Sequence, residues 1–301
     1  MFSLDKKLWQ WLALLFLAFI WGGSFILMKR GLDAFSFVQV ASMRIFFSFL
    51  ILLPISIRHL KAITKQNIWP LLVCGVFGNL LPAYLFTLSE TELSSSLAGI
   101  LNALTPFFTV LIGVIALKNR PGKLQYVGVI VGFLGAAILV TNGNFGSFGD
   151  INLFALFVVL ATIFYGINVN VVRFRLSGLT GTQITSLMFF MVGPMAGIAL
   201  LFTDIPMAVA SPDFWTSLLA TIVLATFGSV ISMFIFNNLI HHTGAIFASS
   251  VTYIVPFFAL MWGLFDNEFI SSLHIYSMLI ILAGVYLSSL KKKPNFKFLK
   301  R

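Results

Sequence analysis

Ten apolar stretches of about twenty residues follow one another along this chain, joined by short polar connections. They cover residues 8–28, 35–57, 68–87, 95–117, 122–140, 153–172, 182–202, 215–238, 245–265 and 272–290. A helix that crosses ~30 Å of hydrocarbon needs about 20 apolar residues. Charged residues make up only 9% of the sequence, whereas a soluble domain carries roughly 25%. The sequence therefore predicts an all-α integral membrane protein with ten transmembrane helices and no soluble domain.

The charges alternate between successive connections. If the N-terminus is cytoplasmic, sixteen of the nineteen Lys and Arg residues fall on the cytoplasmic side, and eight of the nine Asp and Glu residues fall outside. Lys and Arg are retained on the cytoplasmic side of membrane proteins. We therefore expect a multi-pass protein of the cell (inner) membrane with both termini in the cytoplasm. The net charge of +10 is then a topology signal, and we expect no nucleic-acid partner.

The two halves of the chain repeat one another. At offsets of 144 and then 150 residues, the matched pairs are Trp21-Gly22 with Tyr165-Gly166, Gln39-x-x-Ser42 with Gln183-x-x-Ser186, and Pro106-Phe107-Phe108 with Pro256-Phe257-Phe258. An odd number of spans in each half would insert the second half upside down, as in many secondary transporters. We expect two inverted five-helix repeats, residues 1–145 and 146–301.

Several of these positions together carry a family resemblance. Trp21-Gly22, Arg44 in the second stretch, Pro106 in the fourth, and Tyr253-x-x-Pro256 followed by Glu268 resemble the EamA family of the drug/metabolite transporter (DMT) superfamily, over roughly residues 12–290. The resemblance implies a membrane carrier built from two inverted five-helix repeats, often an exporter of amino acids or other small metabolites. The family commonly has Glu twelve residues after the repeated Pro in both halves. Here the first half has Lys118 instead, so a mechanism that requires both acids is in doubt.

Arg44 is the only full charge well inside an apolar stretch. A charged side chain at that depth costs at least ~2.5–3.5 kcal/mol, so it must face a cavity or a partner. One interpretation is a guanidinium that binds a carboxylate or phosphate of the substrate. The other is an Arg that packs between helices and is satisfied by backbone carbonyls or by Asn and Ser side chains.

Neutral polar and aromatic residues inside the apolar stretches extend this candidate site. Polar side chains there pair across helices or line a water-filled path, and aromatic rings form the walls of small-molecule sites. The candidate substrate-binding residues, with Arg44, are Trp21, Tyr84, Asn102, Tyr165, Asn168, Thr252 and Tyr253. The Gln39 and Gln183 pair has the same two interpretations. Aromatic residues also serve as packing and as interfacial anchors.

Three further residues are candidates for gating. Pro106 and Pro256 each remove a backbone hydrogen bond within a stretch, so they could be hinges or static bends. Glu90 lies at the predicted outer end of the third stretch. It could gate the outer mouth or take up a proton, or it could be an exposed loop carboxylate.

These features favour a secondary transporter that moves a small metabolite by alternating access. A phosphate-bearing substrate such as a nucleotide sugar is an alternative, although it would favour several intramembrane cations. An integral membrane enzyme or a channel is a more distant one, because the sequence has no catalytic motif and no ring of like charges. We expect no cofactor and no metal, since there is one cysteine and no ligand spacing. The expected partners are the lipid bilayer and a small-molecule substrate, and a homodimer is an option. Gly128-x-x-x-Gly132, with Gly135, offers a small face for close packing, either within the chain or at a dimer contact.

Overall fold

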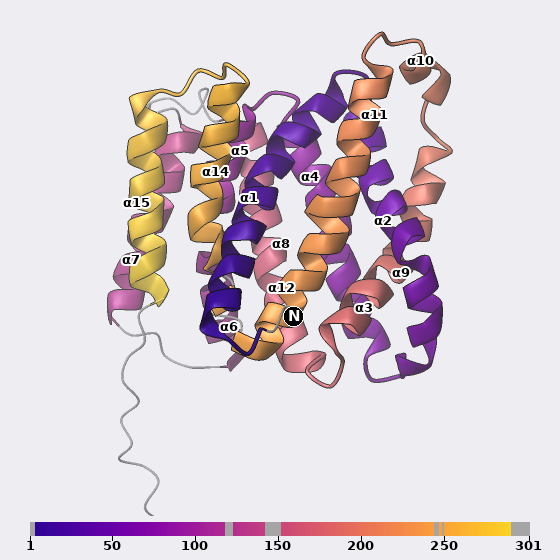
Figure 1. Cartoon of the computed structure of the whole chain (residues 1–301). Helices are drawn as coiled ribbons and strands as arrows, with labels where there is room; N and C mark the ends of the chain where they lie inside the picture. The colour runs from indigo at the N-terminus through magenta and orange to yellow at the C-terminus, as the bar shows by residue number, and fades with distance from the viewer. Residues whose placement is uncertain (1–3, 118–122, 142–151, 244–246, 249, 290–301) are drawn as a thin grey trace, which may run out of the picture.

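The computed structural model describes residues 4–117, 123–141, 152–243, 247–248 and 250–289. Within these ranges the regular structure is entirely helical, with no strand. The helices pack side by side, and their connections gather at two opposite ends of the bundle (Figure 1). The predicted all-α class is therefore confirmed for the part of the chain that is described.

The elements follow the predicted apolar stretches closely. In the first half they are α1 (Lys7–Leu32), α2 (Phe37–His59), η1 (Leu60–Ala62), α3 (Ile68–Gly75), η2 (Val76–Leu80), α4 (Leu81–Ser89), α5 (Ser95–Asn102), α6 (Thr105–Leu117) and α7 (Lys123–Val140). In the second half they are α8 (Leu153–Arg175), α9 (Gly181–Leu200), α10 (Ile205–Val209), α11 (Phe214–Val223), η4 (Leu224–Ile231), α12 (Ser232–Thr243), α14 (Val251–Phe265) and α15 (Ser272–Ser289).

The helices have the length and surface of membrane spans. Seven helical segments are long and apolar enough to cross a membrane, namely Lys7–Leu32, Phe37–Ala62, Ile68–Ser89, Ser95–Ile115, Leu153–Arg175, Gly181–Leu200 and Phe214–Ile240. Three shorter apolar helices accompany them, at Ile130–Val140, Val251–Phe265 and Ser272–Leu287. Large apolar side chains such as Trp69, Trp215 and Phe265 are exposed on the bundle, which is the surface that lipid requires. The chain is a multi-pass membrane protein.

Three of the predicted stretches are interrupted inside. The stretch 95–117 breaks at Ala103 and Leu104, between α5 and α6. Pro106 has no N–H to donate to the carbonyl of Asn102, so a continuous helix would lack that bond. The other two interruptions are the π-helical segments η2 and η4, which widen the helix in the middle of the third and eighth stretches.

The repeated glutamines prove to be helix caps. Gln39 and Gln183 each occupy the third position of a capping box, with Ser36 before α2 and Thr180 before α9. In a capping box the two side chains satisfy backbone N–H groups at the helix start. Gln39 additionally donates to the carbonyl of Asp204 at 3.0 Å. Both glutamines thus begin helices, and neither is among the residues that line the cavity described below.

Equivalent glycines make equivalent close contacts in the two halves. A Cβ on Gly22 would lie 2.5 Å from Cβ of Phe258, and one on Gly166 would lie 2.9 Å from the backbone carbon of Phe108. Gly22 and Gly166 are 144 residues apart, and Phe108 and Phe258 are 150 residues apart. Thus α1 contacts α14 through Gly22 and Phe258, and α8 contacts α6 through the equivalent pair, Gly166 and Phe108.

The contacts of the two π-helical segments are also equivalent in the two halves. Gly78 in η2 lies against the side chain of Asn168, and Gly228 in η4 lies against Ser24, with a Cβ on either glycine falling within 2.7 Å of a side-chain atom. Ser24 and Asn168 are again 144 residues apart. Each π-helical segment is therefore packed against the corresponding helix of the other half.

The predicted small face of α7 is used inside the chain. Gly132 lies directly against Gly284 of α15, and a Cβ on Gly135 would lie 2.9 Å from Ile281. This face therefore joins α7 to α15 and is not free for a second copy. A homodimer remains a prediction without that support.

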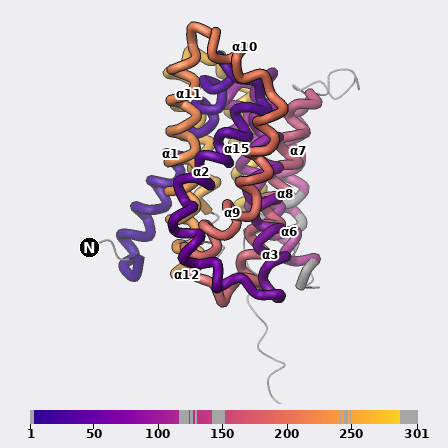
Figure 2. The backbone as a smooth tube through the Cα atoms, turned by 90° about the vertical axis from the view of Figure 1, so that its right-hand side faces the viewer, coloured from indigo at the N-terminus to yellow at the C-terminus, as the bar shows by residue number. Residues whose placement is uncertain are grey.

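The two ends of the bundle can be followed in both views. The connections 33–36, 90–94 and 266–271, with α10, lie at the end drawn at the top of Figure 1, here called the upper end. The helix α1 begins, and α15 ends, at the opposite, lower end (Figure 1). Figure 2 shows α10 and the start of α1 at opposite ends of the same bundle from the side.

Candidate functional site

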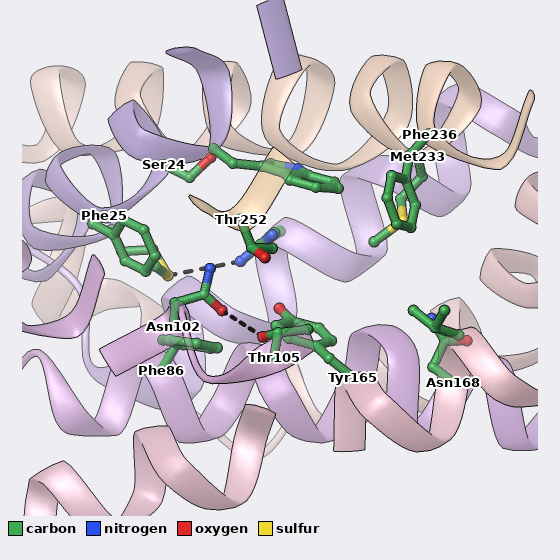
Figure 3. A pocket seen from close by; sticks show the side chains of 14 residues that line it. Ser24, Phe25, Phe86, Asn102, Thr105, Tyr165, Asn168, Met233, Phe236 and Thr252 are labelled. Carbon is green, nitrogen blue, oxygen red and sulfur yellow. Dashed lines mark hydrogen bonds between the residues drawn. The ribbon is translucent and has the colours of Figure 1, made fainter. Parts of the chain in front are cut away.

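A cavity of about 70 Å³ lies inside the bundle between helices of the two halves. Its wall is mostly aromatic and thioether-containing, with one cation and a few neutral polar groups. The lining residues are Trp21, Ser24, Phe25, Met28, Arg44, Phe86, Asn102, Thr105, Tyr165, Asn168, Val169, Met233, Phe236 and Thr252. In Figure 3, Ser24 and Phe25 lie at one side of the cavity and Asn168, Met233 and Phe236 at the other. An apolar pocket with a few convergent polar groups is typical of a small-molecule site.

Six of the eight predicted binding residues line this cavity: Trp21, Arg44, Asn102, Tyr165, Asn168 and Thr252. Tyr84 and Tyr253 are not among the lining residues. The Tyr84 hydroxyl pairs with Ser42 Oγ, and the Tyr253 hydroxyl donates to the carbonyl of Val285 at 3.4 Å. The structure therefore brings most of the predicted set together and places these two rings among packing contacts.

Arg44 lies in the wall of the cavity on α2 and is partly accessible. Its Nε donates to Ser229 Oγ at 2.8 Å, and Nη1 lies 3.7 Å from Met28 Sδ. Among the described residues Arg44 has no carboxylate partner within ion-pair distance. A guanidinium carries five N–H donors, of which these two contacts use only a part. This arrangement suits the binding of an anionic group.

The break between α5 and α6 supplies the neutral polar groups. Asn102 ends α5 and Thr105 begins α6, and the Thr105 hydroxyl donates to Asn102 Oδ1 at 3.2 Å. Thr252 lies beside them in Figure 3. Opposite, Asn168 Oδ1 is buried and has no hydrogen-bond partner among the described residues. The amide of Asn168 packs against Gly78, so this oxygen is enclosed although the residue lines the cavity.

The ring of Trp21 lines the cavity, whereas its indole N–H donates a hydrogen bond to the backbone outside it. Its Nε1 donates to the carbonyl of Gly228 at 3.2 Å, within η4. In a π-helical turn some backbone groups lose their ordinary intrahelical partners. The indole therefore supports the wide turn of η4 while its ring faces the cavity.

Helical spacing could have found several of the missed lining residues. Ser24, Phe25 and Met28 lie three, four and seven residues after Trp21, so they share one face of α1. Val169 follows Asn168, and Phe236 lies three residues after Met233 on α12. Phe86 gives no such signal, because its place depends on the packing of α4 against α1 and α8, where its ring contacts Phe25 and Tyr165.

The two predicted hinge prolines occupy different positions. Pro106 is the second residue of α6, directly after the break, where the first turn of a helix tolerates proline. Pro256 lies inside α14. Whether either position moves remains a prediction.

A cluster of ion pairs at the upper end joins α1 to the connection that follows α14. Lys29 Nζ lies 2.8 Å from Asp266 Oδ2 and 2.9 Å from Glu268 Oε1, and Arg30 pairs with Asp266 and with Asp33. Glu268 also accepts hydrogen bonds from the backbone N–H groups of Ser95 and Ser96, both at 3.0 Å, and from their hydroxyls. We call Lys29, Ser95, Ser96, Asp266 and Glu268 the upper seal.

The seal holds Glu268 in its ionised form. Burial alone would raise its pKa, but the hydrogen bonds from Ser96 and Lys29 outweigh burial and lower the pKa to about 2. Carboxylates at the N-terminus of a helix are stabilised in this way. The Glu that follows the repeated Pro in the second half thus caps α5. Lys118, its counterpart in the first half, lies outside the described residues.

Glu90 lies next to the seal and is buried, with 5% of its surface exposed. The interpretation of Glu90 as an exposed loop carboxylate is therefore wrong. Neither carboxyl oxygen has a hydrogen-bond partner among the described residues. Burial, and then the nearby charge of Glu268, raise the pKa of Glu90 well above its usual value, although Arg44 and Lys29 oppose the rise.

The sequence model of the EamA-like transporter family matches residues 8–141 and 152–290. The chain belongs to the EamA-like transporter family. This confirms the resemblance drawn from Trp21-Gly22, Arg44 and the repeated prolines.

Individual EamA-family relatives agree with that assignment. The chain is 26% identical over 297 residues to the uncharacterized inner membrane transporter YedA of Escherichia coli K12, covering 93% of this chain and 90% of YedA. It is 29% identical over 234 residues to the pseudopaline exporter CntI of Pseudomonas aeruginosa PAO1, covering 77% and 78%. A solved crystal structure matches its fold with a TM-score of 0.62 at 13% identity, covering 94% of this chain and 96% of the other. The EamA-family relatives are named as transporters or exporters, which indicates a DMT-superfamily transporter rather than an enzyme.

Proposed function

We propose that this protein is a secondary transporter that exports a small metabolite, such as an amino acid or another amphipathic compound, by alternating access. The observation that carries the proposal is Arg44, a cation with no carboxylate partner in the described structure, in the wall of a cavity between the two halves. The aromatic wall suits an apolar body, and Arg44 suits a carboxylate on that body.

The polar groups around the cavity support a compound with a second, donating group. Asn168 lies across the cavity from Asn102 and Thr105, and rotation of its amide would present the unpartnered Oδ1 to a bound molecule. A carboxylate at Arg44 and an ammonium or hydroxyl at Asn168 would together satisfy both. A single lining cation favours one carboxylate over a phosphate-bearing metabolite, for which several cations would be expected.

We further propose that the seven long segments and the three shorter helices form ten spans, as two inverted repeats at 1–145 and 146–301. Support comes from the equivalent contacts of Gly22 and Gly166, from those of Gly78 and Gly228, and from the match of the family model to two separate stretches. The upper end would face outward and both termini the cytoplasm, as the alternation of charges favours. Pro106 and Pro256 would be the hinges on which the two halves rock.

The substrate proposal can be tested in two steps. Purified protein is first screened by thermal shift against amino acids, amphipathic carboxylates, nucleotides and sugars. A compound that stabilises the protein is then used, radiolabelled, in a proteoliposome uptake assay. Losing one partner of a buried charge pair costs about 2–5 kcal/mol, so Arg44→Ala should weaken binding at least about tenfold.

The matched control is Arg58→Ala, an exposed arginine in the last turn of the same helix. This variant should bind and transport like the wild type. Undiminished binding and flux in a folded Arg44→Ala protein would remove Arg44 from the site. That result would favour the other interpretation, in which Arg44 packs between helices with Ser229 and Met28 as its partners.

A further inference from the structure

Glu90 lies between the cavity and the upper seal. Its backbone N–H donates to the carbonyl of Phe86, a lining residue one helical turn earlier on α4. On α1, the lining residue Met28 directly precedes Lys29 of the seal, and Met28 Sδ lies 3.7 Å from Thr87 Oγ1. The carboxyl group of Glu90 is therefore enclosed just above the cavity and below the ion pairs that close it.

The cations near Glu90 are already engaged. Lys29 on α1 is held by two carboxylates, those of Asp266 and Glu268. Arg44 on α2 is bonded to Ser229 and contacts Met28. From α8, the phenol of Tyr165 lies on the cavity wall, and its ring stacks on Phe86. From the connection after α14, Glu268 adds a second negative charge.

We propose that Glu90 is a proton-binding site, and that a proton bound there keeps the upper end closed. An ionised carboxylate in this place would be buried, without hydrogen bonds and beside another carboxylate, which is strongly unfavourable. A protonated carboxyl carries no charge and tolerates the same enclosure. The two acids at this end thus have opposite environments: Glu268 is held ionised by its donors, and Glu90 is the one that can change its charge.

Opening of the seal would release this proton. When Glu268 leaves Ser95, Ser96 and Lys29, water reaches Glu90, and the O–H bond of its carboxyl breaks with transfer of the proton to that water. The closed form binds the proton more tightly than the open form does. The advantage of the closed form is therefore complete at acid pH and is lost as the pH rises through the pKa that Glu90 has when enclosed.

The proposal deepens the proposed function by naming the ion that controls closure of its upper end, and it rests on that function for the direction of transport. If the upper end faces outward, a proton taken up from outside closes the seal after the substrate has left. An acidic exterior then favours the return of the empty carrier.

The seal can be tested by thiol labelling of the full chain. Cys74, the only cysteine, is replaced by Ala, and Thr105→Cys in the cavity serves as the reporter. A membrane-impermeant thiol reagent is applied from the upper side across a range of pH. Its rate is divided by that of Ser272→Cys, an exposed position at the same end, to correct for thiol ionisation.

We expect the corrected rate to rise about tenfold with pH, since a difference of one pKa unit between two states changes their ratio tenfold. Glu90→Gln should abolish the pH dependence and keep the rate low, and Glu90→Asp should retain the dependence with a shifted midpoint. The matched control is Glu92→Gln, an exposed carboxylate two residues away, which should leave the profile unchanged.

An independent readout follows the proton itself. Infrared difference spectra of the purified protein across the same pH range should contain the carbonyl band of a protonated carboxyl, and Glu90→Gln should remove it. A band that persists in Glu90→Gln, or a labelling profile that this variant does not change, would overturn the proposal while leaving substrate transport intact. A titrating Glu90 in a protein that transports none of the screened compounds would instead count against the proposed function.

Discussion

At the scale of single residues, the seal and the cavity use charge in opposite ways. Glu268 has more donors than it needs, from Lys29 and two serines, whereas Arg44 lacks a carboxylate partner in the described structure and Glu90 lacks a hydrogen bond. Buried polar groups are normally satisfied, and unsatisfied ones gather where a protein binds or switches. The stabilising role therefore falls to Glu268, whereas Arg44 and Glu90 are candidates for binding and switching.

The cap formed by Glu268 gives a prediction about stability. Glu268→Gln removes an ionised acceptor from the N–H groups of Ser95 and Ser96, and losing a helix cap costs about 0.5–2 kcal/mol. We expect a lower thermal midpoint in detergent at neutral pH. The pKa of Glu268 is lowered to about 2. Its contribution to the free energy of unfolding is therefore complete above the usual Glu pKa of about 4.3 and is lost as the pH falls toward 2.

The pH dependence of the thermal midpoint tests whether the ionised form of Glu268 stabilises the cap. The difference in midpoint between wild type and Glu268→Gln should shrink as the pH falls, and Glu92→Gln should match the wild type throughout. A difference that stays constant down to pH 2 would mean that the ionised carboxylate does not stabilise the cap.

At the scale of elements, the sequence predicted the helices well and their interruptions poorly. Apolar length alone placed α1, α2, α8 and α9 within a few residues, because the lipid thickness sets the length of a span. Pro106 gave a reason to expect the break after α5. The π-helical segments could not be predicted, since they depend on which side chain packs against them: Asn168 on η2 and Ser24 on η4.

The paired glycine contacts give a prediction at this scale. Ala gains about 1 kcal/mol over Gly from helix propensity, so an exposed helical Gly→Ala change stabilises a protein. At Gly22 and Gly166 the new Cβ would collide with the facing helix, and overpacking costs about 1–3 kcal/mol. We expect Gly22→Ala and Gly166→Ala each to lower the thermal midpoint.

Gly178 provides the comparison, because a Cβ there would have no neighbour within 4 Å. Gly178→Ala should leave the midpoint unchanged. If the two helical variants were instead as stable as the wild type, the helices would not approach as closely as the structure has them.

At the scale of the whole molecule, the cavity is assembled from helices far apart in the sequence. Sequence reasoning found Arg44, Asn102 and Thr252 because polar groups are rare in apolar spans. It also named Tyr84 and Tyr253, which do not line this cavity, because an aromatic residue looks the same in sequence whether it lines a site or packs between helices. It also missed the enclosure of Glu90, which depends on how the connection after α4 folds over the bundle.

Alternating access requires the upper end to open, and this gives a prediction for the whole molecule. Arg30→Cys with Asp266→Cys, in the Cys74→Ala background, places thiols at the two sides of an ion pair of the upper end. A short bis-methanethiosulfonate that links them should stop transport of the screened substrate, and reductant should restore it. The single variants are the controls. Full transport by the linked protein would mean that this end does not open.

The carboxylate that caps α5, Glu268, affects how long the protein spends in each state of a transport cycle. Its counterpart in the first half is Lys118, which cannot accept hydrogen bonds from backbone N–H groups, so the opposite end cannot be fastened by the same contact. If the two halves form inverted repeats, as proposed, they are then held by unequal contacts. The empty protein should rest mostly with its upper end shut and visit the other state briefly, so the release of the Glu268 contact would set the pace of the cycle.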